Sequence, residues 1–222
     1  MGEGFALHVT DLVVRARSGR SLLDVPSLTL PSRRALGITG ASGAGKSTLL
    51  FALMGLADDA AGSVCWGETD VLNLSKADRS AFRREAMGMV FQDFLLFEEL
   101  GALENASIRR LFSPKSERAD YVRTAQGLLS NLRVPAQARR VATFSGGERQ
   151  RVAVARALVH DPPILLADEP TANLPREAGR ALVETLLTTV RAAGKTLIVV
   201  SHDPQVLDRM DRVVTLDHGR VI

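Results

Sequence analysis

The sequence predicts one α/β domain with a parallel sheet, an antiparallel β edge and an inserted helical region, and three observations support this. A glycine-rich run at residues 40–48 separates the apolar runs Ala35–Thr39 and Leu49–Leu56, which is the order strand, turn and helix. Residues Ile164–Ala167 are wholly apolar, as expected of a buried parallel strand. From Phe144 onward, strand and helix patterns alternate, which predicts a parallel sheet with right-handed crossovers.

The N-terminal part of the chain predicts antiparallel β structure. Apolar and polar residues alternate through Gly4–Leu30, and a second β segment follows at Gly62–Leu72. Such alternation is typical of strands that bury one face and expose the other. These segments form the predicted β edge.

A complete phosphate-binding pattern, G-x-x-x-x-G-K-[ST], lies between those two segments. Its glycines let successive backbone N–H groups converge on one anion, and the helix beginning near Lys46 adds the positive end of its dipole. Lys46 is expected to reach the β- and γ-phosphates, and the Ser47 hydroxyl to bind Mg²⁺. The residues predicted to hold a nucleoside triphosphate here are Gly40, Ala41, Ser42, Gly43, Ala44, Gly45, Lys46, Ser47 and Thr48.

The region from about Lys76 to Ala142 is predicted to be mostly helical. Ala119–Leu132 is its clearest amphipathic stretch, and Pro114 and Pro135 interrupt the pattern. A short strand is expected within the region, at Gly88–Phe91.

A second anion-binding helix start is predicted in Phe144–Leu158. Ser145 is suited to cap the helix, and Gly146 and Gly147 leave amides exposed at its beginning. A helix N-terminus attracts anions, whereas an ordinary capped surface helix would not need two consecutive glycines after its cap.

This helix start resembles the signature motif of the ABC ATPase family, which normally reads Leu-Ser-Gly-Gly-Gln. Phe144 and Glu148 stand in place of the Leu and the Gln, while Ser145, Gly146 and Gly147 are intact. The resemblance covers essentially the whole chain. It implies a single ABC ATP-binding domain at 1–222, with the β edge and a P-loop NTPase, RecA-like core at 1–91 and 144–222. The loop after Gly88–Phe91 and a helical subdomain would occupy 92–143.

The apolar run at 164–167 ends in two carboxylates, which would reach the nucleotide at the carboxyl end of a buried strand. Asp168 is predicted to hold Mg²⁺, and Glu169 to polarise the attacking water as general base. Alone, an Asp-Glu pair before Pro170 would as often begin a solvated turn. Together with the phosphate-binding motif, it indicates a catalytic pair.

Two further site residues follow from the resemblance. His202 comes directly after the apolar strand Thr196–Val200, where the family has a histidine that contacts the γ-phosphate and holds the catalytic carboxylate. Gln92 resembles the glutamine that links metal and water to the transport subunit, and it is therefore expected both at the metal and in catalysis.

The chain has one phosphate-binding motif and one signature helix, which predicts a head-to-tail homodimer with two composite sites. Each ATP would be held by Lys46 and Ser47 of one protomer and by Ser145 and Gly147 of the other. The predicted nucleotide-binding residues of the signature helix are Ser145, Gly146, Gly147 and Glu148. The resemblance also implies integral membrane permease subunits as partners, at the cytoplasmic face of the inner membrane.

Composition agrees with that placement. Among 222 residues, 45% are hydrophobic and 24% charged, and no apolar segment approaches the roughly 20 residues that span a bilayer. Residues 1–7 lack the features of a signal peptide, and the lone Cys65 suits a reducing compartment. The formal net charge is +3 and the arginine pairs are dispersed, so nucleic-acid binding is not expected.

The branch within the family is suggested by three segments: Ser145–Ala153, Leu166–Leu174 and Ala102–Asn105. They resemble the lipoprotein-releasing and macrolide-export branch, which implies export or extraction of a lipid, lipoprotein or hydrophobic compound. Phosphonate-utilisation ATPases are also similar, and an ATP-dependent regulator that signals to a membrane partner would carry the same motifs. ABC ATPases acting on DNA or ribosomes fit less well, because this chain has neither a long coiled-coil insertion nor a second cassette.

Three features leave alternatives open. Ala16 stands where the family usually stacks an aromatic ring on adenine, and Arg15 or Arg17 is the candidate replacement. Pro175 stands where the family usually has aspartate, although proline readily opens the following helix. The apolar run Phe94–Phe97 either lines a groove for a helix of the membrane subunit or fills the core of the helical subdomain.

Overall fold

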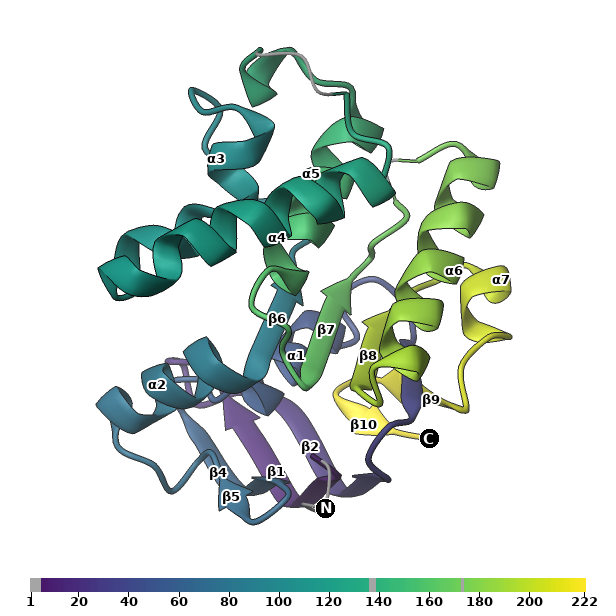
Figure 1. Ribbon diagram of the computed structural model, residues 1–222. Coiled ribbons are helices and arrows are strands. Elements are labelled where there is room, and N and C mark those ends of the chain that lie inside the picture. The colour runs from purple at the N-terminus through teal and green to yellow at the C-terminus, as the bar shows by residue number, and fades with distance from the viewer. Residues whose placement is uncertain (1–4, 136–138, 173) are drawn as a thin grey trace.

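Two β-sheets and a layer of helices make up the computed structural model, which describes residues 5–135, 139–172 and 174–222 (Figure 1). The antiparallel sheet confirms the predicted β edge, and its strands follow the spatial order β2-β1-β4-β5. These strands are β1 (Leu7–Arg15), β2 (Ser21–Leu30), β4 (Ala60–Trp66) and β5 (Thr69–Asp70).

The second sheet has the order β10-β9-β3-β8-β7-β6, and only the β10–β9 pairing in it is antiparallel. In register, Ile38 and Asp168 both lie beside Val200, so the carboxyl ends of β3, β8 and β7 come level with one another. Strands β6, β7 and β8 are buried throughout, which explains their unbroken apolar sequences. The strands are β3 (Ala35–Thr39), β6 (Met87–Val90), β7 (Ile164–Asp168), β8 (Thr196–Val200), β9 (Arg212–Asp217) and β10 (Arg220–Val221).

The helices are distributed between and around the two sheets (Figure 1). α1 is apolar on most sides because it contacts strands of both sheets. The α-helices are α1 (Lys46–Leu53), α2 (Lys76–Ala86), α3 (Ala102–Ala106), α4 (Arg118–Asn131), α5 (Gly146–Leu158), α6 (Arg176–Ala192) and α7 (Pro204–Leu207), and 3₁₀ turns occupy Ile108–Phe112, Lys115–Glu117 and Val141–Thr143. No helix in the described part of the chain is both long and apolar enough to cross a membrane.

Two hydrophobic clusters form the core. The first surrounds α1 and includes Trp66, whose Nε1–H donates to the carbonyl oxygen of Leu53 at 2.8 Å. The second fills the space between the parallel sheet and helices α4, α5 and α6. α5 packs on α3 and α4 and also on β6, so it contacts both the helical layer and the sheet. The division of the domain at 143/144 therefore stays a prediction.

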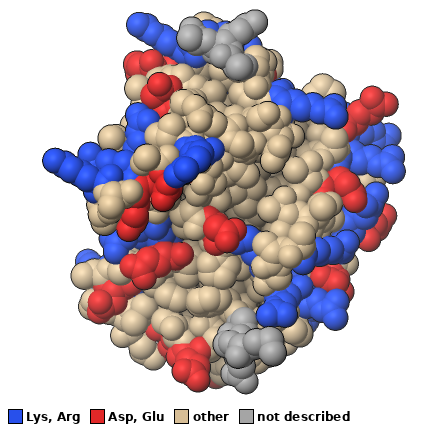
Figure 2. All heavy atoms as spheres, in the orientation of Figure 1, with Lys and Arg blue, Asp and Glu red and all other residues tan. Residues whose placement is uncertain are grey.

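The helical prediction for Lys76–Ala142 holds only in part. Helices α2, α3 and α4 are present, but residues 91–100 are irregular and the expected strand lies one residue earlier than predicted, at Met87–Val90. The backbone of the irregular segment is satisfied by side chains distant in sequence, a pattern that periodicity cannot reveal. On the surface, Figure 2 shows positive and negative side chains interspersed over one face. The expectation of no nucleic-acid binding stays a prediction.

The packing of α5 on β6 yields a stability test at Gly88. A Cβ atom there would lie 2.3 Å from the carbonyl oxygen of Ala157 and 2.9 Å from Pro162. We expect Gly88→Ala to cost about 1–3 kcal/mol of the free energy of unfolding, because backbone or proline must shift. Gly127→Ala is the matched control, since its Cβ would meet nothing within 4 Å on exposed α4. It should be neutral or stabilising by up to about 1 kcal/mol. Thermal unfolding followed by circular dichroism measures both, and equal midpoints would contradict the packing argument.

Candidate functional site

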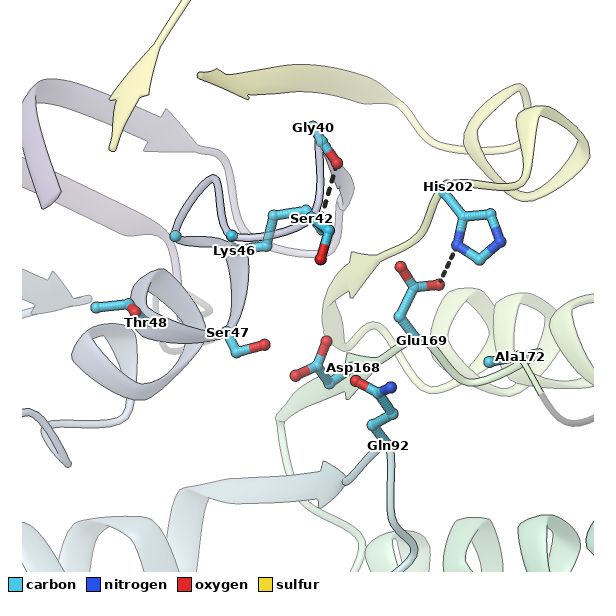
Figure 3. Close-up of a pocket in the computed structure, with 12 residues that line it drawn as sticks. Gly40, Ser42, Lys46, Ser47, Thr48, Gln92, Asp168, Glu169, Ala172 and His202 are labelled. Atoms are coloured by element: carbon cyan, nitrogen blue, oxygen red, sulfur yellow. Dashed lines mark hydrogen bonds and ion pairs between the residues drawn. The ribbon is translucent and has the colours of Figure 1, made fainter. Parts of the chain in front are cut away.

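A pocket of about 480 Å³ lies at the carboxyl ends of β3, β7 and β8, which are aligned with one another (Figure 3). It brings together seven of the nine residues predicted to bind phosphate, among them the predicted metal ligand Ser47, with the other four residues predicted for metal and water. Among the described residues, its lining consists of Gly40, Ser42, Gly43, Gly45, Lys46, Ser47, Thr48, Gln92, Asp168, Glu169, Ala172 and His202. Ala41 and Ala44 do not line it, and Ala172 is a lining residue that no sequence pattern indicated.

The glycines of the loop after β3 are required for two different reasons, backbone conformation and close packing. Gly43 and Gly45 have φ angles of 77° and 101°, in the region where a side chain is strained, as the anion-cradle interpretation requires. Gly40 is different, because a Cβ atom there would lie 2.1 Å from the carbonyl oxygen of Leu216 in β9. The first glycine of the motif is thus required by packing against a neighbouring strand as well as by its own φ of 146°.

Lys46 begins α1 and folds back over the loop. Its Nζ donates hydrogen bonds to the carbonyl oxygens of Gly40 at 2.8 Å and Ala41 at 2.9 Å. Gly45 caps the helix without any side-chain hydrogen bond, which leaves the first N–H groups of α1 available to an anion. Ala41 thus contributes through its backbone, although its side chain does not line the pocket.

An oxygen-rich corner of the pocket fits the coordination chemistry of Mg²⁺. Asp168 ends β7 and is 6% exposed, and Figure 3 shows its carboxylate between Ser47 and Gln92. Burial raises the pKa of Asp168 and the adjacent Glu169 raises it further, whereas the Ser47 hydroxyl and the charge of Lys46 lower it. A carboxylate, a hydroxyl and an amide oxygen are the hard ligands that Mg²⁺ prefers.

Glu169 and His202 form a hydrogen-bonded pair across two strand ends (Figure 3). The Nδ1 of His202 lies 2.9 Å from Oε2 of Glu169, whose side chain is only 12% exposed. The backbone N–H of Glu169 donates to Val200 at 3.0 Å, which continues the β7–β8 ladder one residue beyond β7. Its φ of 46° is unusual for a residue with a side chain, and such strain is concentrated at functional sites.

The predicted signature residues lie outside this pocket, at the start of α5. Ser145 Oγ accepts from the N–H of Glu148, and Oε2 of Glu148 accepts from the N–H and hydroxyl of Ser145 at 2.8 and 2.9 Å. These bonds lower the pKa of Glu148, as does its ion pair with Arg139. Glu148 therefore orders the helix start, and Ser145 is exposed to solvent.

Packing also explains the second signature glycine. A Cβ atom on Gly147 would lie 2.9 Å from Cδ2 of Leu174, a residue in the segment that follows β7. The signature helix and the loop that follows Asp168 and Glu169 are therefore in close contact within one chain. Gly146 precedes it as the first residue of α5.

The two departures from the family pattern have clear positions in the fold. Ala16 lies in the turn between β1 and β2, where its N–H donates to Arg20 at 2.9 Å, and no aromatic ring replaces it there. Tyr121 instead accepts from Arg109, and Trp66 is in the core. Stacking of an arginine on adenine stays a prediction. Pro175 caps α6 with φ −54°, which confirms that proline is compatible with this helix start.

Comparison with known proteins agrees with this geometry. A family model described as ABC transporter matches residues 23–172. LolD, the lipoprotein-releasing system ATP-binding protein of Geobacter metallireducens, is 39% identical over 97% of this chain and 97% of its own length. YbbA of Escherichia coli, an uncharacterised ABC transporter ATP-binding protein, is 37% identical over 96% of this chain and 94% of its own length.

Solved structures of an ABC transporter cassette are also similar to this chain. The dimeric structure of MJ0796, described as a bacterial ABC transporter cassette, superposes with a TM-score of 0.88 at 30% identity, covering 97% of this chain and 96% of that one. A second structure of the same cassette is a dimeric post-hydrolysis state bound to ADP and Pi. The chain belongs to the ABC transporter family and is an ABC ATPase, the ATP-binding subunit of a transporter.

Proposed function

We propose that this ATPase works as a homodimer with two composite sites and drives separately encoded membrane permease subunits from the cytoplasmic face of the inner membrane. The observation that carries the proposal is the division of the site: the phosphate-binding loop and the catalytic residues share one pocket, whereas Ser145 is exposed elsewhere. A second copy of the chain can supply the missing face.

In the proposed mechanism, the loop and the start of α1 bind the phosphates of ATP. Lys46 exchanges its bonds to the carbonyl oxygens of Gly40 and Ala41 for the β- and γ-phosphates. Ser47, Asp168 and Gln92 would hold Mg²⁺, which neutralises negative charge on the phosphates when bound.

Glu169 is proposed to accept the proton of the attacking water. Its carboxylate is mostly buried and is oriented by His202, which leaves the other carboxylate oxygen to face the pocket (Figure 3). A base held by a neighbouring hydrogen bond does not need to reorganise during proton transfer. His202 also lies where it can donate to the γ-phosphate, since its side chain is 73% exposed at the pocket.

The permease is proposed to dock on a groove beside β6. This groove of about 460 Å³ is lined by Met89, Phe91, Leu95 and Phe112 and by three arginines. Leu95 and Phe112 are 57% and 79% exposed. Exposed apolar residues around a concave surface are typical of a protein-binding site. Within the run 94–97, Phe94 is buried and Leu96 packs on the second core cluster, so only Leu95 and Phe97 are proposed to face the permease.

Export of lipoprotein, lipid or a hydrophobic compound is proposed as the direction and the cargo. The support is the likeness to LolD proteins, each described as part of a lipoprotein-releasing system. Cargo recognition would then belong to the permease, and this chain would supply only the ATP-driven motion.

Removing the proposed base tests the catalytic assignment. Glu169→Gln keeps the shape of the side chain but cannot accept the proton, so we expect turnover to fall by about 10²–10⁴-fold while ATP still binds. His202→Ala should also abolish turnover, and Lys46→Ala should weaken ATP binding itself. Phosphate release and nucleotide binding measure the two effects. Glu177→Gln, an exposed carboxylate in the first turn of α6, is the matched control and should hydrolyse normally. Near-normal phosphate release by Glu169→Gln would refute the assignment.

The oligomeric state tests the composite site. The Glu169→Gln variant with ATP and Mg²⁺ should form a stable dimer of about twice the monomer mass by light scattering, because unhydrolysed ATP joins both protomers. Adding Ser145→Arg should prevent this dimer, since a long side chain would enter the shared site. Ser130→Arg on exposed α4 is the control and should still dimerise. The composite site would be excluded by a monomer in Glu169→Gln together with wild-type activity independent of protein concentration.

Changes in the groove test docking. Leu95→Ser combined with Phe112→Ser should abolish co-purification with the co-expressed permease, while the melting temperature and the isolated ATPase activity stay unchanged. Both side chains are more than half exposed, so little core packing is lost. Ile222→Ser removes another apolar residue, 77% exposed, and serves as the control. If the melting temperature of the double variant falls together with its capture of the permease, these residues belong to the core instead.

A further inference from the structure

The segment Phe94–Phe97 is held in place by side chains, although among the described residues no strand pairs with it. Asn105 in α3 is fully buried and forms hydrogen bonds with both backbone groups of Phe97. Its Oδ1 accepts from the N–H of Phe97 at 2.8 Å, and its Nδ2 donates to the carbonyl oxygen of Phe97 at 2.9 Å and to that of Gly101 at 3.1 Å. A buried amide with these bonds acts as a substitute for a neighbouring strand.

The other end of the segment is held by α5. Arg156 donates to the carbonyl oxygen of Phe94 at 2.6 Å and also to that of Leu95. Arg149, two helical turns earlier, has its guanidinium 6.0 Å from the ring centre of Phe94. The guanidinium of Arg156 needs its bonds to the carbonyl oxygens of Phe94 and Leu95 to compensate for lost hydration. The contact of Arg156 with this turn is therefore specific.

The backbone at this point is in an unfavourable conformation. Phe94 and Leu95 have φ angles of 60° and 48°, two successive left-handed residues that both carry large side chains. A left-handed backbone is unfavourable for residues with large side chains, so it persists only where surrounding contacts hold it. The consequence is a sharp turn in which Phe94 is buried while Leu95 and Phe97 are 57% and 53% exposed.

We propose that Arg156 and Asn105 are positioning residues that hold Leu95 and Phe97 in one fixed geometry for the permease. This inference rests on the docking function proposed above. It adds a mechanical link: α5 is continuous from Gly146, at the proposed γ-phosphate contact, to the arginine that holds the docking turn. The same helix therefore joins the proposed nucleotide contact to the turn that carries Leu95 and Phe97.

Hydrogen exchange on the isolated chain tests the hold itself. Asn105→Ala should speed exchange of the Phe97 amide by about 10-fold or more, because its acceptor is removed. Arg156→Gln and Arg156→Lys should both speed exchange at Leu95, since neither side chain reproduces the two-pronged donation of arginine. Asn131→Ala and Arg123→Gln, both exposed on α4, are the matched controls and should exchange as wild type. Unchanged exchange in the Asn105 and Arg156 variants overturns the inference.

Capture of the co-expressed permease in detergent tests the consequence. The Arg156→Lys variant should bind about 10–100-fold more weakly than wild type, equivalent to ordering one or two residues on docking. Its ATP affinity and isolated turnover should stay unchanged, which separates positioning from general destabilisation. Equal capture by this variant and wild type overturns the inference alone. Failure of the wild type to capture the permease, with Phe97 exchange altered as expected, overturns the docking function instead.

Discussion

The alignment of three buried parallel strands is the constraint on which the site depends. Hydrogen bonding along β3, β8 and β7 brings Ile38, Val200 and Asp168 level, so the residue after each strand emerges at the same edge. The ladder continues one step further through the N–H of Glu169 and the carbonyl oxygen of Val200. A one-residue slip in the β7–β8 pairing would turn Asp168 to the opposite face of the sheet.

The same alignment explains why an unfavourable backbone is tolerated at Glu169, the proposed general base. Glu169 has a positive φ because its N–H is committed to β8 while its side chain turns toward His202. Two buried strands and the hydrogen bond between the two side chains hold this geometry. Asp168, one residue earlier, remains in the regular strand and is largely desolvated, so burial raises its pKa. Neighbouring carboxylates thus have different environments, which suits the different roles proposed for them.

α5 connects the other functional surfaces. Its first turn is ordered by the capping box of Ser145 and Glu148, and its far end packs directly on β6 beside Gly88. Between these ends it carries the arginines that hold the turn at Phe94. Contact of Leu174 with Gly147 joins the same helix to the segment after β7. One helix therefore carries the residues proposed to contact the ATP of the other protomer and also holds the turn proposed to bind the permease.

The sequence by itself determined the fold class, the two sheets, and most of the residues that gather at the pocket. These signals are local: the phosphate-binding pattern, the fully apolar strands that end at Asp168 and before His202, and the capped glycine pair after Ser145 each depend on residues adjacent in the chain. Local rules of conformation and periodicity locate these segments, whereas the roles of His202 and Gln92 were inferred from the resemblance to the ABC ATPase family.

Only the tertiary structure decided the rest, because the deciding contacts join residues distant in sequence. A side chain at position 40 would collide with the backbone of β9, so Gly40 is required there. Ala172 lines the pocket because the chain after β7 passes beside it. The irregular turn at Phe94 is held by Asn105 and Arg156. The apolar run 94–97 looked uniform in sequence but divides between core and surface, since side-chain direction there follows from the left-handed backbone. A backbone of this kind is held by long-range hydrogen bonds, which no periodicity in the sequence encodes.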